Sequence, residues 1–213
     1  MVVSVLGLFS VSAQAAVVFT FDTGDGVTPS LDGWTIIAQS TGAQNVPYLQ
    51  VDGSERNRIN TDPVLGTAWD IDGEGGGFRG DNAHDPLIAR SPSFFINEAG
   101  NITWSDAGGN SGTAPVGTAG SYGAGAQGLA LVRESDGVVI ASVAANQTPV
   151  IDVGALGLLN DGNAYFLEAV DTRSGGWGYV EWDNISVPGS LVPEPSSALL
   201  GLVGGLLLLR RRR

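Results

Sequence analysis

The chain contains no cysteine and no lysine, and it has one histidine and one methionine. Without cysteine it can form no disulfide, zinc-thiolate site or thiolate nucleophile, so packing must supply its stability. The one histidine, His84, stands beside Asp85, and no Gly-x-Ser-x-Gly sequence accompanies it, which argues against a serine hydrolase. His-Glu-x-x-His, P-loop and dinucleotide-binding motifs are also missing. We therefore expect no catalytic residue.

Positive charge is scarce. Ten arginines stand against 22 aspartates and glutamates, which gives a net charge of −12, and the last four residues of the chain are all arginine. So acidic a surface repels phosphate backbones, which argues against nucleic-acid binding. It favours solubility and suits divalent cations, although ordinary solvation of the surface explains most of these carboxylates equally well.

The C-terminal segment, residues 190–213, has three parts. Val192-Pro193-Glu194-Pro195 contains two prolines, which favour an extended backbone that a processing enzyme can reach. Residues 196–209 carry no charge, and as a helix they reach only ~21 Å, short of the ~30 Å hydrocarbon core. We expect a short transmembrane helix that spans only with local thinning of the bilayer. The basic stop, Arg210, Arg211, Arg212 and Arg213, is expected to stay in the cytoplasm.

This order of motif, apolar span and arginines resembles the PEP-CTERM sorting signal of Gram-negative bacteria that make exopolysaccharide. The resemblance implies that a membrane enzyme, exosortase, recognises Pro193, Glu194 and Pro195 and removes the tail. It also implies an exported precursor that is held transiently in the inner membrane and then reaches the cell surface or the extracellular matrix of a biofilm. A C-terminal anchor that is never cleaved is the alternative.

Residues 1–16 form an apolar run that ends in Ala13-Gln14-Ala15, the small-x-small pattern of a signal-peptide cleavage site. The usual basic n-region is missing, which suggests a start that lies downstream of the true one; a first buried strand or helix is the alternative. The expected organisation is a signal peptide at 1–16, one folded domain at 17–189 and the sorting segment at 190–213. In that segment the motif is 192–195, the span 196–209 and the stop 210–213.

The residues between the two ends have a β pattern throughout. Short stretches rich in β-branched and aromatic residues are bounded by Gly, Asp, Asn or Pro, and no amphipathic helical pattern competes with them. The expected strands are Val17–Phe21, Trp34–Ala38, Ser93–Ile96, Asn101–Trp104, Gly128–Val132, Val138–Val143, Ala164–Val170 and Gly178–Val187. They predict an all-β fold, an antiparallel β-sandwich of jelly-roll type. Two glycine-rich segments, 73–85 and 108–125, are expected to be loops, the second a mobile coil.

Several stretches resemble the galactose-binding-like jelly-roll domains of carbohydrate-binding modules: Phe21–Asp25, Gly33-Trp34, Leu87–Phe95, Asp171, Gly175–Tyr179 and Trp182–Ile185. In that family a structural calcium ion often lies where the first and last strands meet. The resemblance implies a Ca²⁺ site formed by Asp22 or Asp25 together with Asp183, because calcium takes six to eight oxygen ligands. The alternative for each residue is an aspartate that caps a turn.

Sugar binding requires exposed aromatic faces beside polar groups. Trp69, Phe78, Trp177 and Tyr179 lie in or next to Gly/Asp-rich segments and are the candidates, with core packing as the alternative for each. Trp34, Trp104 and Trp182 lie in expected strands and are assigned to the core. We expect a non-catalytic surface or matrix protein that binds glycan, such as the exopolysaccharide, or acts structurally.

The alternative is a secreted glycoside hydrolase, which needs only two carboxyl groups at the right separation. The chain offers Glu55, Glu74, Glu134, Glu168 and Glu181 among others, and the sequence distinguishes none of them.

Overall fold

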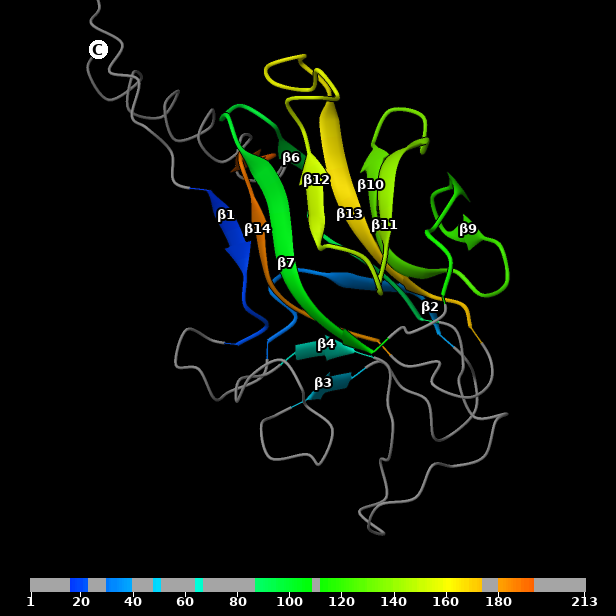
Figure 1. The fold of residues 1–213 in the computed structure, drawn as a ribbon. Helices are drawn as coiled ribbons and strands as arrows, with labels where there is room; N and C mark the ends of the chain where they lie inside the picture. The colour runs from blue at the N-terminus through cyan, green and yellow to red at the C-terminus, as the bar shows by residue number, and fades with distance from the viewer. Residues whose placement is uncertain are drawn as a thin grey trace, which may run out of the picture.

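The structure is a computed structural model that describes residues 16–22, 30–39, 48–50, 64–66, 87–108, 112–173 and 180–193. Within these ranges every regular element is a β-strand, which confirms the predicted all-β class. Two antiparallel sheets curl around a common core, an arrangement consistent with a β-sandwich (Figure 1). The described ranges contain no helix long and apolar enough to cross a membrane, and the predicted span at 196–209 lies outside them.

The first sheet has the strand order β12-β7-β14-β4-β3, and β1 pairs with the remaining part of β14. Its strands are β1 (Val17–Phe19), β3 (Tyr48–Gln50), β4 (Val64–Gly66), β7 (Asn101–Gly108), β12 (Val150–Asp152) and β14 (Val180–Val187). The first described strand, β1, and the last long one, β14, are therefore neighbours. Their register pairs Val17 with Val187 and Phe19 with Ile185.

The second sheet has the order β11-β10-β13-β5-β2, and β6 joins it between β13 and the short C-terminal strand β15. Its strands are β2 (Thr35–Gln39), β5 (Leu87–Arg90), β6 (Phe94–Phe95), β10 (Gln127–Arg133), β11 (Val139–Ala144), β13 (Ala164–Asp171) and β15 (Ser190–Leu191). A separate hairpin is formed by β8 (Gly117–Thr118) and β9 (Ser121–Tyr122).

The strand β13 shows how the sequence produces the layers. Its side chains alternate between two faces, as in any strand, and Leu167 and Ala169 enter the main core. Phe166, on the opposite face, packs in a second apolar cluster to which Tyr122 of the β8–β9 hairpin contributes. Because the core covers one face and the hairpin part of the other, β13 is buried along almost its whole length.

The main core contains apolar residues of both sheets, among them three tryptophans. Trp34, Trp104 and Trp182 are 3%, 6% and 0% exposed, which confirms their assignment to the core. The Trp34 ring meets Phe19 and Phe21 edge-on, with ring centroids 5.5 and 5.6 Å apart. Such edge-to-face pairs stabilise a core beyond the area that they bury.

All eight stretches predicted as strands contain strands, with ends that differ by a few residues. The short strands β3, β4, β5, β8, β9, β12 and β15 are not among the eight expected strands, since two to four residues beside Gly or Pro carry too little periodicity. The prediction of a coil across 108–125 is wrong for residues 117–122, which form the β8–β9 hairpin. Its position over the second sheet explains the difference, because tertiary contacts order a sequence of low strand propensity.

The register distinguishes two ends of the sandwich. We call the end with Val17, Val187 and Ala164 the proximal end, and the end with Val180, Asp171 and Leu87 the distal end. The loop 153–163 joins β12 to β13 at the proximal end, which is the upper end in Figure 1. There the Asn160 N–H donates to the Ile96 carbonyl oxygen at 2.8 Å.

Candidate functional site

The predicted sorting motif begins where the body of the protein ends. Strand β15 pairs with β6, and one residue later the Val192 N–H donates to the Ser93 carbonyl oxygen at 2.8 Å. The next residue, Pro193, has no N–H to donate and is exposed. Glu194 and Pro195, the rest of the motif, and the basic stop at 210–213 lie outside the described residues.

Both ends of the body lie at the proximal end of the sandwich. Val17, the first residue of β1, pairs with Val187, and only a short turn separates Val187 from β15. Leu191 of β15 pairs with Phe94, Phe94 with Tyr165, and Tyr165 with Arg133 at the proximal end of β10. The position that follows the predicted signal peptide and the position that precedes the predicted tail therefore lie on one side.

The pairing of β1 with β14 relates the positions of two of the predicted calcium ligands, one in the turn after β1 and one in β14. Asp22 lies three residues beyond Phe19, and Asp183 lies two residues before its partner Ile185. Asp183 is fully buried, and its carboxylate accepts the Asn184 N–H at 2.6 Å and the Asn184 side-chain amide at 2.7 Å. The described residues contain no group of three or more His, Cys, Asp or Glu that could hold a metal ion, and Asp25 lies outside them.

A third aspartate near this point was not singled out from the sequence. One carboxylate oxygen of Asp32 accepts the N–H groups of Thr20 and Phe21, both at 2.8 Å. Phe21 and Asp32 themselves have left-handed backbone angles, with φ of 56° and 49°. Asp32 therefore fixes the turn that follows β1, a role that the spacing of the sequence could not indicate because it joins residues eleven and twelve positions apart.

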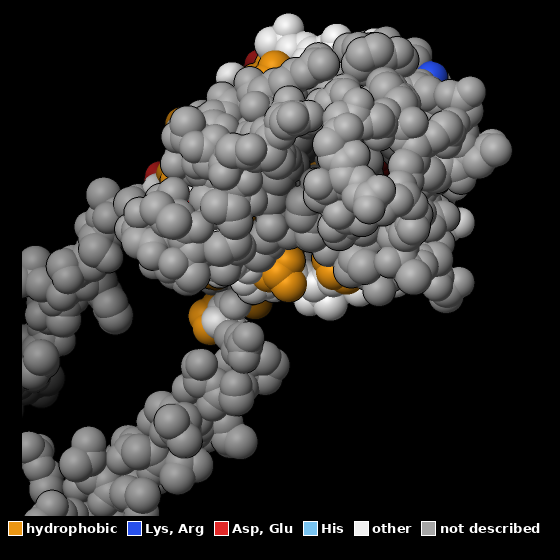
Figure 2. Space-filling model, turned by 90° about the horizontal axis from the view of Figure 1, so that it is seen from below, with side chains coloured by type: hydrophobic (Ala, Val, Ile, Leu, Met, Phe, Trp, Pro, Cys, Tyr) orange, Lys and Arg blue, Asp and Glu red, His pale blue; other side chains and the backbone are white. Residues whose placement is uncertain are grey.

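The aromatic candidates for glycan binding, Trp69, Phe78, Trp177 and Tyr179, all lie outside the described residues. The described strands on either side of these segments reach the same end of the sandwich. Trp69 follows β4, Phe78 precedes β5, and Trp177 and Tyr179 stand between β13 and β14. Gly66, Leu87, Asp171 and Val180, the strand residues that flank these segments, all lie at the distal end. Figure 2 views the molecule from this end.

Glu168 is one of the carboxylates that the sequence left undistinguished, and it is fully buried. It accepts four hydrogen bonds: from Arg90 Nε at 2.9 Å and Nη2 at 2.6 Å, from the Gly120 N–H at 2.9 Å, and from the Tyr122 hydroxyl. The Arg90 guanidinium lies 4.3 Å from the centre of the Phe166 ring. Burial and the neighbouring carboxylate raise the pKa of Tyr122, so its hydroxyl remains a donor. Glu168 thus attaches the β8–β9 hairpin to the second sheet.

Asp106 is the described carboxyl group whose pKa is raised most clearly toward neutrality. Burial raises its pKa to about 6, and a 3.4 Å hydrogen bond from Trp104 Nε1 offsets this only in part. Its partner across the sheet is Trp182, whose own indole N–H has no hydrogen-bond partner among the described residues. Asp183 stands next along β14, but alternation of side chains directs it to the other face. Asp183 therefore does not face Asp106.

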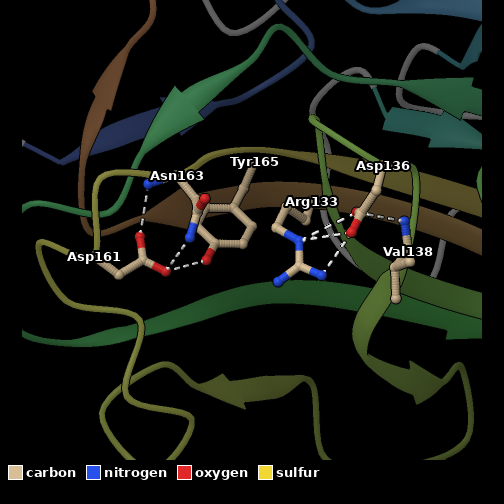
Figure 3. A network of polar contacts seen from close by, with 6 residues as sticks. All are labelled: Arg133, Asp136, Val138, Asp161, Asn163 and Tyr165. Carbon is tan, nitrogen blue, oxygen red and sulfur yellow. Dashed lines mark hydrogen bonds and ion pairs between the residues drawn. The ribbon is translucent and has the colours of Figure 1, made fainter.

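A polar network occupies two turns of the proximal end (Figure 3). Arg133 Nη2 lies 2.6 Å from Asp136, and this hydrogen-bonded ion pair lowers the pKa of the Asp136 carboxyl. Nearby, Asp161 accepts the Tyr165 hydroxyl and, at 2.9 Å, the Asn163 side-chain amide. Desolvation would raise the pKa of Asp161, but these hydrogen bonds outweigh it and lower the pKa.

The Tyr165 ring is buried, and burial together with the Asp161 carboxylate raises the pKa of its hydroxyl to about 12. Each described member of the network has a partner, so the network orders the two turns.

Comparison of the chain with protein-family models, with curated proteins and with solved structures found no match.

Proposed function

We propose that this chain is an exported, non-catalytic protein of the cell surface or exopolysaccharide matrix, sorted through its C-terminal PEP-CTERM signal. The observation that carries the proposal is the position of Pro193, which is exposed and directly follows Val192, whose N–H donates to the Ser93 carbonyl oxygen. A processing enzyme needs an extended, accessible substrate, and the exposure of Pro193 supports access at that position. Cleavage there would leave the strand pairing of the body unchanged.

The proposal is tested by replacing the central residue of the motif, Glu194→Ala, in cells that produce the processing enzyme. The wild-type chain is expected to lose its tail and leave the membrane fraction, whereas the variant is expected to keep its tail and remain with the membrane. Glu134→Ala, which removes an exposed glutamate of the folded domain, is the matched control and should be processed like the wild type. Equal processing of all three chains would contradict recognition of the motif.

For the molecular activity we propose glycan binding on a galactose-binding-like jelly roll, with the binding surface at the distal end. Support comes from the strands that flank the segments of Trp69, Phe78, Trp177 and Tyr179, which all end there. Phe78→Ala and Trp177→Ala should each weaken binding to polysaccharide by about twofold to tenfold, the effect of losing one aromatic contact of ~0.5–1.5 kcal/mol. Leu159→Ala, at the proximal end, is the control. Absence of binding across a broad glycan panel in calcium would leave a structural role in the matrix.

We also propose the structural Ca²⁺ site between the turn after β1 and β14, with Asp22 or Asp25 and Asp183 as ligands. The pairing of β1 with β14 supports it, because Asp22 follows β1 three residues after Phe19 and Asp183 lies in β14 two residues before Ile185, the partner of Phe19. Added calcium should raise the melting temperature of the wild-type chain, and Asp22→Asn should reduce that increase. The same increase in both proteins would argue for binding elsewhere.

The alternative function, glycoside hydrolysis, is favoured by one observation, the raised pKa of Asp106, which suits a general acid. The engagement of Glu168 by four hydrogen bonds weighs against that carboxylate as its partner. Release of reducing sugar by the wild-type protein, abolished by Asp106→Asn, would overturn the non-catalytic proposal.

A further inference from the structure

The proximal end carries an unusual share of the exposed apolar side chains. Of the eight large apolar residues that are exposed among the described ones, five lie at or near this end: Val18, Val138, Leu156, Leu159 and Leu191. Scattered exposed leucines need no explanation, but several at one end of a soluble domain indicate an interaction surface.

The loop 153–163 presents two of these leucines in a fixed geometry. Leu158 is buried, while Leu156 and Leu159 on either side of it are 41% and 42% exposed. The Leu158 N–H donates to the Val153 carbonyl oxygen at 3.1 Å, and the next turn is closed on the Ile96 carbonyl oxygen through Asn160, which has a φ of 54°. The leucines are thus held outward by hydrogen bonds of the loop backbone rather than by a lack of structure.

The position of Pro193 at the proximal end indicates which partner the exposed apolar residues would contact. Leu191 is 43% exposed and lies two residues before Pro193. The apolar run of the tail begins at residue 196, so at ~3.5 Å per residue it starts within about 10 Å of Pro193. If the tail spans the bilayer, as the proposed function requires, the proximal end must lie close to the surface of that bilayer.

The charged residues at the proximal end determine which lipid headgroups this end can approach. Arg133 is paired with Asp136, and the remaining charged residues of its turns are acidic: Glu98, Glu134, Asp152 and Asp161. Anionic headgroups would be repelled by this set, whereas leucine side chains enter the interfacial region of any bilayer. The surface therefore suits a zwitterionic membrane and depends little on salt.

We propose that Leu156 and Leu159, with Leu191 beside the exit of the tail, form a membrane-contact surface on which the precursor rests while its tail spans the bilayer. This proposal depends on the proposed C-terminal anchor. It gives the precursor a defined orientation, with the distal end directed away from the membrane. Three leucines add only weak affinity of their own, so the contact ends when the tail is removed.

The absence of cysteine allows a clean test on the full chain, since one introduced cysteine takes a single fluorescent label. Leu159→Cys reports on the proximal end, and Asn146→Cys, in the exposed turn that follows β11 at the distal end, is the matched control. Each labelled chain is reconstituted through its tail into phosphatidylcholine vesicles. At position 159 we expect blue-shifted emission and at least about twofold stronger quenching by spin-labelled lipid than at position 146, because that label lies in the interface.

Two results would overturn the proposal, and they differ. If the chain floats with the vesicles but the label at 159 behaves like the label at 146, the anchor is correct and the membrane-contact surface is refuted. If the chain does not float with the vesicles, the anchor itself fails, and the contact surface fails with it. Leu156→Ser in the chain labelled at 159 should reduce the quenching without releasing the chain, since the tail still holds it.

Discussion

Asp106 shows at the scale of one residue how burial sets the properties of a carboxyl group. It lies on β7, where it accepts a hydrogen bond from Trp104 Nε1 and stands opposite Trp182 on β14. Burial raises its pKa to about 6. In the unfolded chain an aspartate has a pKa near ~3.9. Between these two values the folded state binds more protons than the unfolded state, so the free energy of unfolding contributed by this group falls as the pH rises.

We therefore expect Asp106→Asn to stabilise the protein by about 1–2 kcal/mol above pH 6, where the wild-type carboxyl is ionised in both states. The advantage should shrink as the pH falls from about 6 to about 4. Denaturant unfolding at several pH values measures it. Asp161→Asn is the control, because the pKa of Asp161 is lowered rather than raised and its loss should bring no gain at pH 7. A stability difference for Asp106→Asn that does not change with pH would contradict the assignment.

The three tryptophans of the core could be predicted from the sequence, since each stands in or beside a stretch of strand pattern. The roles of Asp32 and Glu168 could not be predicted. Their partners, Thr20 and Phe21 for the first and Arg90 and Tyr122 for the second, are distant along the chain and are brought near only by the pairing of strands. A charged residue that carries no local signal looks the same in a sequence whether it is solvated or buried.

At the scale of one element, the β8–β9 hairpin also depends on contacts between distant residues that the sequence does not reveal. Glycine and small polar residues predicted a coil there, and hydrogen bonds to one buried carboxylate fix a hairpin instead. Gly120 donates its N–H to Glu168 at 2.9 Å, and Tyr122 donates its hydroxyl to the same carboxylate. Tertiary contacts of this kind outweigh local propensity.

Tyr122→Phe removes one of these donors and should destabilise the hairpin by about 1.5–3 kcal/mol, the usual contribution of a hydrogen bond to a charged group. Hydrogen exchange of the Gly120 amide should then be faster, while the amides of Leu129 and Leu131 in β10 should stay protected. Ser121→Ala, which removes an exposed hydroxyl from the same hairpin, should leave exchange unchanged. Equal acceleration in the two variants would mean that Glu168 does not hold the hairpin.

Strand β15 is the element that positions the exit of the tail, and a glycine permits its pairing. A Cβ atom on Gly189 would lie 1.9 Å from the Phe95 carbonyl oxygen, which is a backbone atom and cannot move aside alone. Gly189→Ala should therefore destabilise the protein by about 2–3 kcal/mol, seen as a lower midpoint of denaturant unfolding. A Cβ on Gly123 would meet nothing within 4 Å, so Gly123→Ala should change stability by less than ~0.5 kcal/mol. Equal midpoints for the two variants would contradict the close approach of β15 to β6.

At the scale of the whole molecule, the two ends of the sandwich differ in what they carry. The body begins at β1 and ends after β15 on one side, and the strands that flank the candidate glycan-binding segments end on the other side. The sequence predicted the class of fold and most long strands. The residue pattern by itself could not predict that the two ends meet, because the pairing of Val17 with Val187 joins positions at opposite ends of the body. Only the resemblance to galactose-binding-like domains implied that the first and last strands are neighbours.

The central claim is that an acidic β domain is exported, held by a short C-terminal segment and released by cleavage near Pro193. Mass spectrometry of the intact protein, purified from the cells that produce it, tests this claim most directly because it reads both mature ends. We predict a chain that begins after the apolar run at 1–16 and lacks Arg210–Arg213, with any attached group seen as added mass. A stable cytosolic chain that keeps both the apolar start and the four arginines would contradict the account.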